Sequence, residues 1–240
     1  MNIYDVNSPK DALYGNPYVG RGIMIGKTPN SKNAVFAYFI MGRSENSRNR
    51  VFLPVGRDIK ILPFDESKLK DPSLIIYYPV RDIGKIIIVT NGDQTDTIRD
   101  ALLSGGTFES ALDTRCFEPD APNYTPRISG IIYLGDGDFK YKLSILKSID
   151  VIGSDCVRET FSYPAKAGLG HFIHTYFTDG NPLPTFGGEP KRISISDSID
   201  EFTNEIWDNL DENNKISLYV RYVSLLDGSV TDRIINKHQK

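Results

Sequence analysis

The sequence predicts an α+β protein in which mainly antiparallel sheets are covered by helices. Extended segments rich in β-branched and aromatic residues dominate the chain, and short turn-forming stretches join several of them as hairpins. Amphipathic helical patterns are few and do not alternate with single strands, as they would in a parallel α/β fold. At 240 residues the chain can bury a sizeable core, and we expect one domain spanning residues 1–240.

The first half of the chain predicts two hairpins. Residues 18–26 and 33–42 read as strands around the turn-rich "KTPNSK". Residues 73–80 and 85–91 form a second pair around "RDIG". Because each pair is joined by a short connection, the strands of each pair are expected to run antiparallel.

A helix is predicted after the second hairpin. Asp93 is suited to cap it, and Ile98, Ala101 and Leu102 share one face. The glycine pair that starts at Gly105 ends the pattern. A second short helix is expected in "TFESALDTRCF".

The second half continues the strand pattern and adds one long helix. Residues 128–135 and 139–149 flank "DGD" and predict a hairpin, and "VRETFSYP" and "HFIHTYFTD" read as further strands. "SDSIDEFTNEIWDNLDENN" places five apolar residues at helical spacing behind a Ser/Asp cap: Ile199, Phe202, Ile206, Trp207 and Leu210. "ISLYVRYVS" predicts a closing strand, and residues 237–240 are expected to be frayed.

Composition narrows the class of partner. The net charge is −3, from 31 acidic and 28 basic residues, so no general positive field attracts nucleic acid or an anionic membrane. Neither a secretory leader nor an apolar run of membrane-spanning length is visible, so a cytoplasmic protein is expected. Cys116 and Cys156 match no metal or redox spacing, which suits a reducing compartment.

Three arginines gather in residues 41–52, "MGRSENSRNRVF". Arg43, Arg48 and Arg50 are interleaved with Asn46 and Asn49 near the end of a predicted strand. Guanidinium groups bind phosphate and carboxylate oxygens through paired hydrogen bonds, and the neighbouring Ser and Asn side chains add neutral donors. The alternative is a solvated loop whose arginines pair with the protein's own carboxylates.

A second polar cluster lies in "TNGDQTDTI", where a strand ends and a helix begins. Asn91 and Asp93 stand at this junction with Thr95 and Asp96. Free N–H groups at a helix N-terminus suit a phosphate or an amide-bearing ligand. Simple capping by Asp93 would explain the same residues.

The stretch "EPDAPNYTPRISG", residues 118–130, is a stiffened loop. Its three prolines exclude a helix and a central strand. A stiff loop is useful for fixing side chains in a site. The candidates it carries are Glu118, Asp120, Asn123, Tyr124, Thr125 and Arg127.

Other motifs exclude several chemistries. "GRGIMIGKT" is not a P-loop, because Arg21 occupies a required glycine position and the segment reads as strand into turn. His171 and His174 lie three apart in a predicted strand and therefore face opposite sides, so no metal site is expected there. No G-x-S-x-G elbow exists, and Asn2 cannot act as an N-terminal nucleophile.

The segment around residues 171–190 leaves its role open. His174 and Tyr176 share a strand face and are candidates to line a pocket, although core packing is an equal alternative. "GNPLPTFGGEP", which contains Glu189, is either a wall or lid of a site or a structured connector.

Taken together, these stretches resemble the IMP cyclohydrolase family best known from archaea. The resemblance rests on "YVGRGIMIG", "GRSENSRNR", "LIIYYPVR", "TNGDQTDTI" and "EPDAPNYTPRISG", in that order, over roughly residues 18–135. "GHFIHTYFTDGNPLPTFGGEP" is similar to an extended, bacterial form of the family. The resemblance implies an αββα sandwich similar to that of the N-terminal-nucleophile hydrolases, without their processed nucleophile.

The resemblance also implies a reaction and roles for the residues. A cyclic-amidine hydrolase working in the ring-closing direction would convert a small-molecule purine ribonucleotide, 5-formamidoimidazole-4-carboxamide ribonucleotide, to inosine 5′-monophosphate (IMP), with no metal or organic cofactor. Arg43 and Tyr77 would polarise the formyl oxygen and Glu118 would transfer protons. Substrate-binding roles would fall to Arg21, Arg48, Arg50, Asn91, Asp93, Asp120, Asn123, Thr125, Arg127 and His174.

Within that set, the implied roles differ. Arg48 and Arg50 are candidates for the phosphate, and Asn91 and Asp93 for the ribose or carboxamide. Asp120 would lie near the reacting amide, while the other residues of the proline loop orient the base or support the loop.

Two other functions remain open at this point. One is a non-catalytic regulatory module that binds a purine nucleotide without turnover. The other is an amide hydrolase on the same fold with an unrecognised nucleophile. A homo-oligomer is a further possibility, to which the 171–190 segment would be a candidate contributor.

Overall fold

In the computed structural model, which describes residues 2, 4–69 and 76–238, the chain forms two antiparallel sheets. The first sheet has six strands in the order β11-β10-β1-β2-β12-β13. These strands are β1 (Arg21–Lys27), β2 (Asn33–Met41), β10 (Leu169–His174), β11 (Lys191–Ser194), β12 (Lys215–Ser224) and β13 (Val230–Asn236).

The second sheet has seven strands that follow one another in chain order, from β3 to β9. They are β3 (Val51–Val55), β4 (Asp58–Leu62), β5 (Val80–Asp82), β6 (Ile86–Thr90), β7 (Arg127–Leu134), β8 (Phe139–Ser148) and β9 (Cys156–Pro164). This sheet is therefore a meander of neighbouring hairpins, whereas the first sheet joins strands from both ends of the chain.

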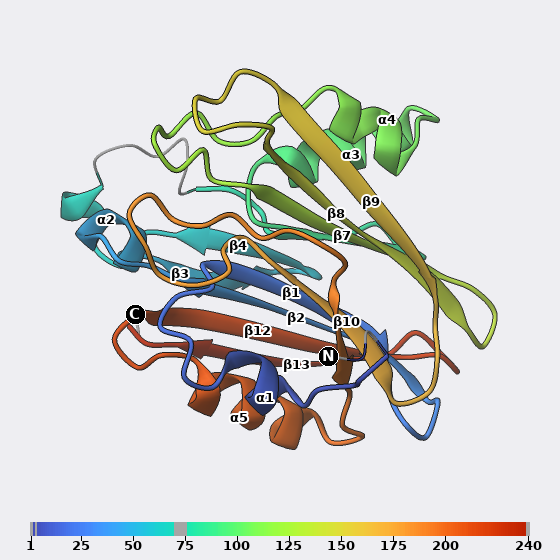
Figure 1. The fold of residues 1–240 in the computed structure, drawn as a ribbon. Coiled ribbons are helices and arrows are strands. Elements are labelled where there is room, and N and C mark those ends of the chain that lie inside the picture. Colours follow the sequence, from blue (N-terminus) through green and yellow to red (C-terminus); the bar gives the residue numbers. More distant parts are fainter. Residues whose placement is uncertain (1, 3, 70–75, 239–240) are drawn as a thin grey trace.

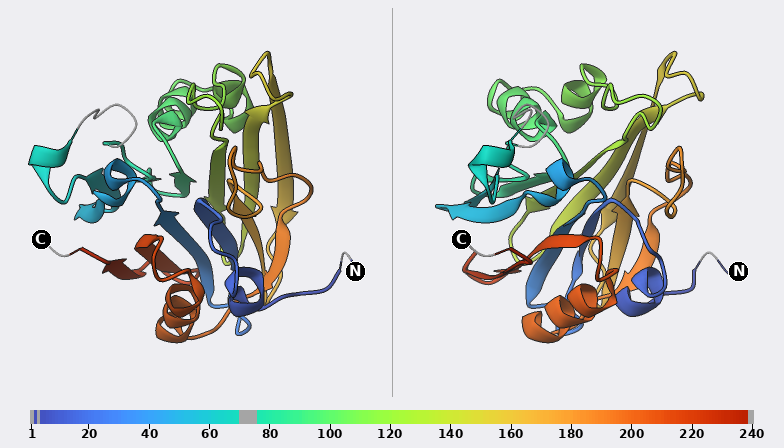
Figure 2. Two further views of the ribbon diagram at one scale, coloured as in Figure 1. Left: turned by 60° about the vertical axis from the view of Figure 1, so that its left-hand side comes forward. Right: turned by 90° about the vertical axis from the view of Figure 1, so that its left-hand side faces the viewer.

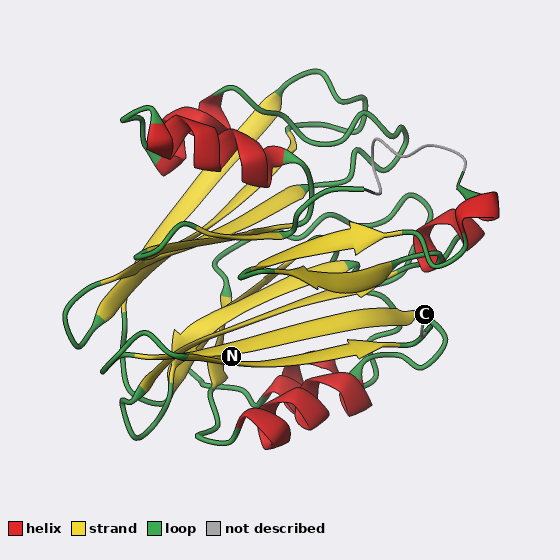
Figure 3. Cartoon of the chain, turned by 180° about the vertical axis from the view of Figure 1, so that it is seen from behind, coloured by secondary structure: helices red, strands yellow, loops and turns green. Residues whose placement is uncertain are grey.

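Helices cover the outer face of each sheet, and the two sheets face one another (Figures 1 and 3). α1 (Pro9–Leu13) and α5 (Ile199–Asn209) pack on the six-stranded sheet, and α3 (Gln94–Leu103) and α4 (Phe108–Asp113) on the seven-stranded one. The short α2 (Glu45–Arg48) and a 3-10 turn (Glu66–Lys68) lie to one side (Figure 2). The predicted α+β class with antiparallel sheets is confirmed.

The largest part of the core lies between the sheets. Phe36 and Tyr219 from the first sheet and Ile87 and Leu143 from the second are fully buried there. All of β1 is buried, because one face meets the other sheet and the opposite face lies under the helical layer. That double burial explains why β1 and β2 read as continuous apolar runs rather than as alternating patterns.

Local sequence signals located most of these elements. The hairpins at residues 21–41 and 127–148 pair as expected, and α3, α4 and α5 are all present. Gly137 in the "DGD" turn and Gly105 after α3 have the positive φ that such turns and helix ends require. No helix in the described ranges is long and apolar enough to cross a bilayer.

Two predicted strands were too long. Residues 76–79 are irregular and β5 begins only at Val80, since Pro79 lacks an N–H to donate; residues 73–75 lie outside the described ranges. The strand predicted for "HFIHTYFTD" ends at His174, where the chain turns into a loop. The patterns also missed β3, β4, β11 and β13, which are short or largely polar strands that form only beside their neighbours.

Candidate functional site

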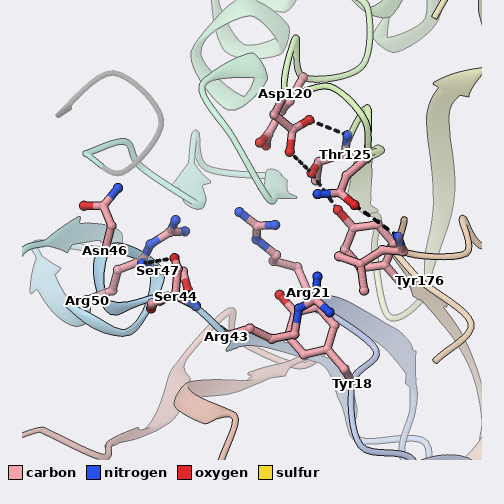
Figure 4. A pocket seen from close by; sticks show the side chains of 13 residues that line it. Tyr18, Arg21, Arg43, Ser44, Asn46, Ser47, Arg50, Asp120, Thr125 and Tyr176 are labelled. Atoms are coloured by element: carbon pink, nitrogen blue, oxygen red, sulfur yellow. Dashed lines mark hydrogen bonds between the residues drawn. The ribbon is translucent and has the colours of Figure 1, made fainter. Parts of the chain in front are cut away.

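A pocket opens where the start of β1, the α2 segment, the proline loop and the β10–β11 connection meet. Its cavity volume is about 320 Å³, within the range of small-molecule sites. Thirteen residues line it (Figure 4): Tyr18, Arg21, Arg43, Ser44, Asn46, Ser47, Arg50, Glu118, Asp120, Asn123, Thr125, Tyr176 and Leu183.

Two buried arginines dominate the pocket. Arg21 begins β1 and is 8% exposed, and Arg50 directly precedes β3 and is 4% exposed. Among the described residues, Nε of Arg21 and both Nε and Nη1 of Arg50 have no hydrogen-bond partner. Buried donors without partners are costly, and in a pocket a ligand or water can complete their bonds. The pocket is therefore suited to an anionic or carbonyl-bearing ligand.

The two guanidinium groups also act on one another. Burial lowers the pKa of Arg50, and the positive charge of Arg21 lowers it further. Burial also opposes the charge on Arg21, but the nearby Glu118 and the tyrosines outweigh it and raise the pKa of Arg21. The two guanidinium groups thus lie close together in a confined site, where electrostatic interactions with a bound anion are stronger than in water.

Glu118 is the buried acid of the site. It begins the proline loop, is 5% exposed, and has a raised pKa chiefly because it is buried. Arg21 and Arg127 oppose that rise, while Asp120 adds to it. A carboxyl group whose pKa is moved toward neutrality can both give and take a proton, which is what acid–base catalysis needs.

Tyr77 lies behind this charged group rather than among the lining residues. Its hydroxyl is 3.0 Å from that of Tyr38 in β2. Burial raises the pKa of Tyr77, and the charges of Arg50 and Arg21 reduce that rise. Tyr77 therefore keeps its proton and belongs to the same electrostatic cluster as the two arginines.

The proline loop is held by bonds within itself and to its neighbours. Asp120 accepts hydrogen bonds from the Thr125 backbone N–H at 2.6 Å and from the Thr125 hydroxyl at 2.5 Å. The N–H of Glu118 donates to the Thr125 carbonyl at 2.9 Å. Asn123 accepts from the N–H of Leu183. The stiffness predicted from the prolines is thus used to fix two carboxylates at the pocket.

Arg43 stands at the rim rather than in the interior. It pairs with Asp179 at 2.5 Å, donates to the Gly180 carbonyl at 2.9 Å, and lies over the ring of Tyr18. At the same end, Ser44 and Ser47 cap α2 reciprocally. The Oδ1 atom of Asn46 is buried without a partner among the described residues.

Besides Tyr77, five predicted site residues lie outside the pocket lining. Arg48 donates to the Gly42 carbonyl and to Asn214. Asn91 bonds to the Pro126 carbonyl and the Ile128 N–H, and so fastens the end of the proline loop. His174 is fully buried, with its ring stacked on that of Phe172 and tilted against that of Phe186.

Asp93 and Arg127 form an ion pair below the proline loop. Asp93 is the N-terminal boundary of α3 but makes no side-chain cap, so the predicted capping role was wrong. Its carboxylate instead accepts from Arg115 and Arg127, whose positive charges outweigh burial and lower the pKa of Asp93. A carboxylate held by two arginines gains more than it would from capping one N–H.

Sequence reasoning missed several lining residues. Tyr18 was not singled out, Ser44 and Ser47 entered only as neutral donors beside the arginines, and Leu183 only as part of a loop that could wall a site. Tyr176, a candidate to line a pocket, is among the lining residues. Gly20 offered a usable signal, since it has φ +76° and a Cβ there would lie 2.0 Å from Thr175 and 2.7 Å from the Tyr176 ring. Within the described ranges, no three His, Cys, Asp or Glu residues are grouped to hold a metal ion.

The fold and pocket define an α+β protein with two facing antiparallel sheets and a polar pocket that holds two buried arginines and a buried acid. Comparison with known families then shows to which family the chain belongs. Residues 18–229 match the model of the family described as IMP cyclohydrolase-like protein, and the chain belongs to that family.

Its relatives include three archaeal proteins that are each named IMP cyclohydrolase. The protein of Methanococcus aeolicus is 28% identical over 193 residues, covering 73% of this chain and 85% of its own. That of Methanococcus maripaludis is 34% identical over 52% of this chain and 67% of its own. That of Methanocaldococcus jannaschii is 29% identical over 54% and 68%.

Proposed function

We propose that this protein is an IMP cyclohydrolase, which closes 5-formamidoimidazole-4-carboxamide ribonucleotide to IMP with loss of water. The observation that carries the proposal is the pocket itself. It holds the buried acid Glu118 and two buried arginines with donors that have no partner in the described part of the chain. Family membership and the names of the archaeal relatives support the same reaction.

The phosphate is assigned to the end of the pocket formed by α2 and its flanks. Figure 4 shows Arg50 with Ser44, Asn46 and Ser47 on one side of Arg21, and Asp120 with Thr125 on the other. A dianionic phosphate is favoured beside the hydroxyl donors and Arg50, whose Nε and Nη1 have no partner among the described residues, and disfavoured beside the Asp120 carboxylate. The base then extends toward Arg21 and Glu118.

Ring closure needs orientation, charge stabilisation and proton transfer. The carboxamide nitrogen attacks the formyl carbon, the new C–N bond forms, and negative charge develops on the formyl oxygen. The unpaired Nε of Arg21 is the donor that we assign to that oxygen, with Tyr77 close by. Arg43 is less suited to this role, because Asp179 holds it at the rim.

Glu118 is assigned the proton transfers. It would take a proton from the attacking carboxamide nitrogen and give it to the formyl oxygen, which becomes a hydroxyl. It would then take the proton of the formamido N–H and give it to that hydroxyl as the C–O bond breaks, so that water leaves, the ring C=N bond forms and the carboxyl group ends in its starting state. Groups held in such a geometry contribute roughly 10²–10⁴-fold each to the rate. The stiff proline loop keeps Glu118 in place while the substrate's two reacting groups are brought together.

We further infer a fold related to the N-terminal-nucleophile hydrolases. The helix–sheet–sheet–helix arrangement supports this assignment. We also propose that residues 1–240 form a single domain that carries the activity, with the purine ribonucleotide as its small-molecule partner. The protein is proposed to act in the cytoplasm. The proposed chemistry uses only side chains, so neither metal nor organic cofactor enters it.

The test is a spectrophotometric assay of ring closure in the presence of EDTA. Wild-type protein is expected to form the purine chromophore, and Glu118→Gln and Arg21→Gln to lose at least about 100-fold in rate while remaining folded. Arg48→Gln is the matched control, because Arg48 points away from the pocket. Tight IMP binding without turnover would instead indicate a regulatory module. A protein that shows neither turnover nor IMP binding would reject the assignment.

A further inference from the structure

The connection between β10 and β11 supplies one wall of the pocket through Tyr176. The Tyr176 side chain is almost fully buried and its ring stacks with that of Tyr18 at 5.9 Å. It also lies directly against the backbone of Gly20, the residue before Arg21. Tyr176 therefore sits between the strand that carries Arg21 and the proline loop that carries Glu118.

The hydroxyl of Tyr176 leads into the proline loop through a short chain of hydrogen bonds. Its oxygen is 2.6 Å from Oγ1 of Thr125, which is 2.5 Å from Oδ2 of Asp120 (Figure 4). The single hydroxyl proton of Thr125 goes to the carboxylate, which can only accept, so Tyr176 must be the donor to Thr125. Burial raises the pKa of Tyr176, so its proton stays available for that bond.

Thr125 is the point at which both carboxylates of the loop are fixed. Its hydroxyl and backbone N–H bind Asp120, and its carbonyl accepts from the N–H of Glu118. A shift of Thr125 would therefore move Asp120 and the backbone of Glu118 together. The Tyr176 hydroxyl is bonded to this residue from outside the loop, across 51 positions of sequence.

We propose that Tyr176 is a positioning residue of the active site: through Thr125 its hydroxyl fixes Asp120 and Glu118 relative to Arg21. This inference rests on the proposed function, because its main readout is ring closure. A misplacement of about 1 Å can cost 10²-fold in rate without loss of the fold. Packing alone would require only the ring of Tyr176, which phenylalanine also supplies.

The test compares kcat and KM in variants of the chain of hydrogen bonds. Tyr176→Phe is expected to lower kcat about 10-fold or more, with KM changed less than about threefold. Thr125→Val should lower kcat at least as much. Thr125→Ser, which retains the hydroxyl, should keep kcat close to that of the wild type. Tyr222→Phe is the matched control, because this buried hydroxyl bonds to the Ser196 carbonyl away from the pocket.

A double variant decides whether Tyr176 acts through Thr125. Tyr176→Phe combined with Thr125→Val should be no slower than Thr125→Val within about twofold, since the partner of the tyrosine is already gone. If the losses of kcat in the two single variants multiply in the double variant, the inference about Tyr176 is wrong. Full kcat in Tyr176→Phe beside an active wild type would also overturn it, and either result would leave the proposed function standing. A wild-type protein without turnover would overturn the proposed function, and the inference with it.

Discussion

The strongest quantitative consequence of the site concerns Arg50, which should lower the stability of the ligand-free protein and raise its affinity for the nucleotide. Its Nε and Nη1 atoms are buried without partners among the described residues, and Arg21 repels it. If a bound nucleotide accepts from both atoms, two charge-assisted hydrogen bonds of about 1.5–3 kcal/mol each are gained on binding. Arg50→Met should therefore weaken IMP binding by about 10² to 10⁴-fold.

The same substitution should stabilise the empty protein. Methionine removes a buried charge for which the described residues offer no ion pair, and it fills much of the same volume. We expect the free energy of unfolding to rise by about 1–3 kcal/mol, as when buried ionic groups are replaced by apolar ones. The increase corresponds to roughly 2–4 °C in the melting temperature for each kcal/mol.

Calorimetric titration with IMP and urea unfolding of the ligand-free protein test both signs, in buffer free of phosphate and sulfate. Arg221→Met is the matched control: Arg221 is equally buried, but its guanidinium binds Asp232 at 2.8 and 3.0 Å and the Arg57 carbonyl. That control should lose about 3–5 kcal/mol of stability and keep its IMP affinity. An Arg50→Met protein that is less stable and still binds IMP normally would refute the reasoning.

Two further outcomes follow from buried groups. Burial lowers the pKa of His171 to about 4 and that of His174 to about 3, so between pH 6.5 and 4 the unfolded chain binds more protons and stability falls with falling pH. Each histidine should lower the free energy of unfolding by about 2 kcal/mol by pH 5. In His174→Phe, the free energy of urea unfolding should therefore fall less steeply with falling pH than in the wild type. An unchanged dependence on pH, or an equal effect of the control His238→Gln, would contradict this. Gly20→Ala should destabilise the protein by about 2 kcal/mol or more, because φ is +76° and the new Cβ would meet Thr175 at 2.0 Å. Gly56→Ala is the control in the same thermal-unfolding assay and should cost less, since Gly56 also has a positive φ but lies in open space. Equal losses in the two variants would exclude the clash.

The sequence by itself determined the fold class, most of the strands and the stiff loop of the site. Hairpins such as residues 127–148 and helices such as α5 are set by turn residues and by the period of apolar side chains, which are local properties. Glu118, Asp120 and Arg50 were found because their residue types and the prolines around them are visible in the chain.

Tertiary structure decided which of these candidates meet. Arg48 and Arg50 are two positions apart, yet one ends a short helix facing Asn214 and the other precedes β3 inside the pocket. Asn91 and Asp93 carry ligand-binding types of side chain, but the proline loop uses them as its own supports. Tyr176 reaches Thr125 across 51 residues because β10 pairs with β1, and β1 packs against β7 of the other sheet, which the proline loop precedes. A side chain's type is written in the sequence, but its direction and partners are fixed only when distant strands pack, since hydrogen bonds and burial depend on neighbours in space.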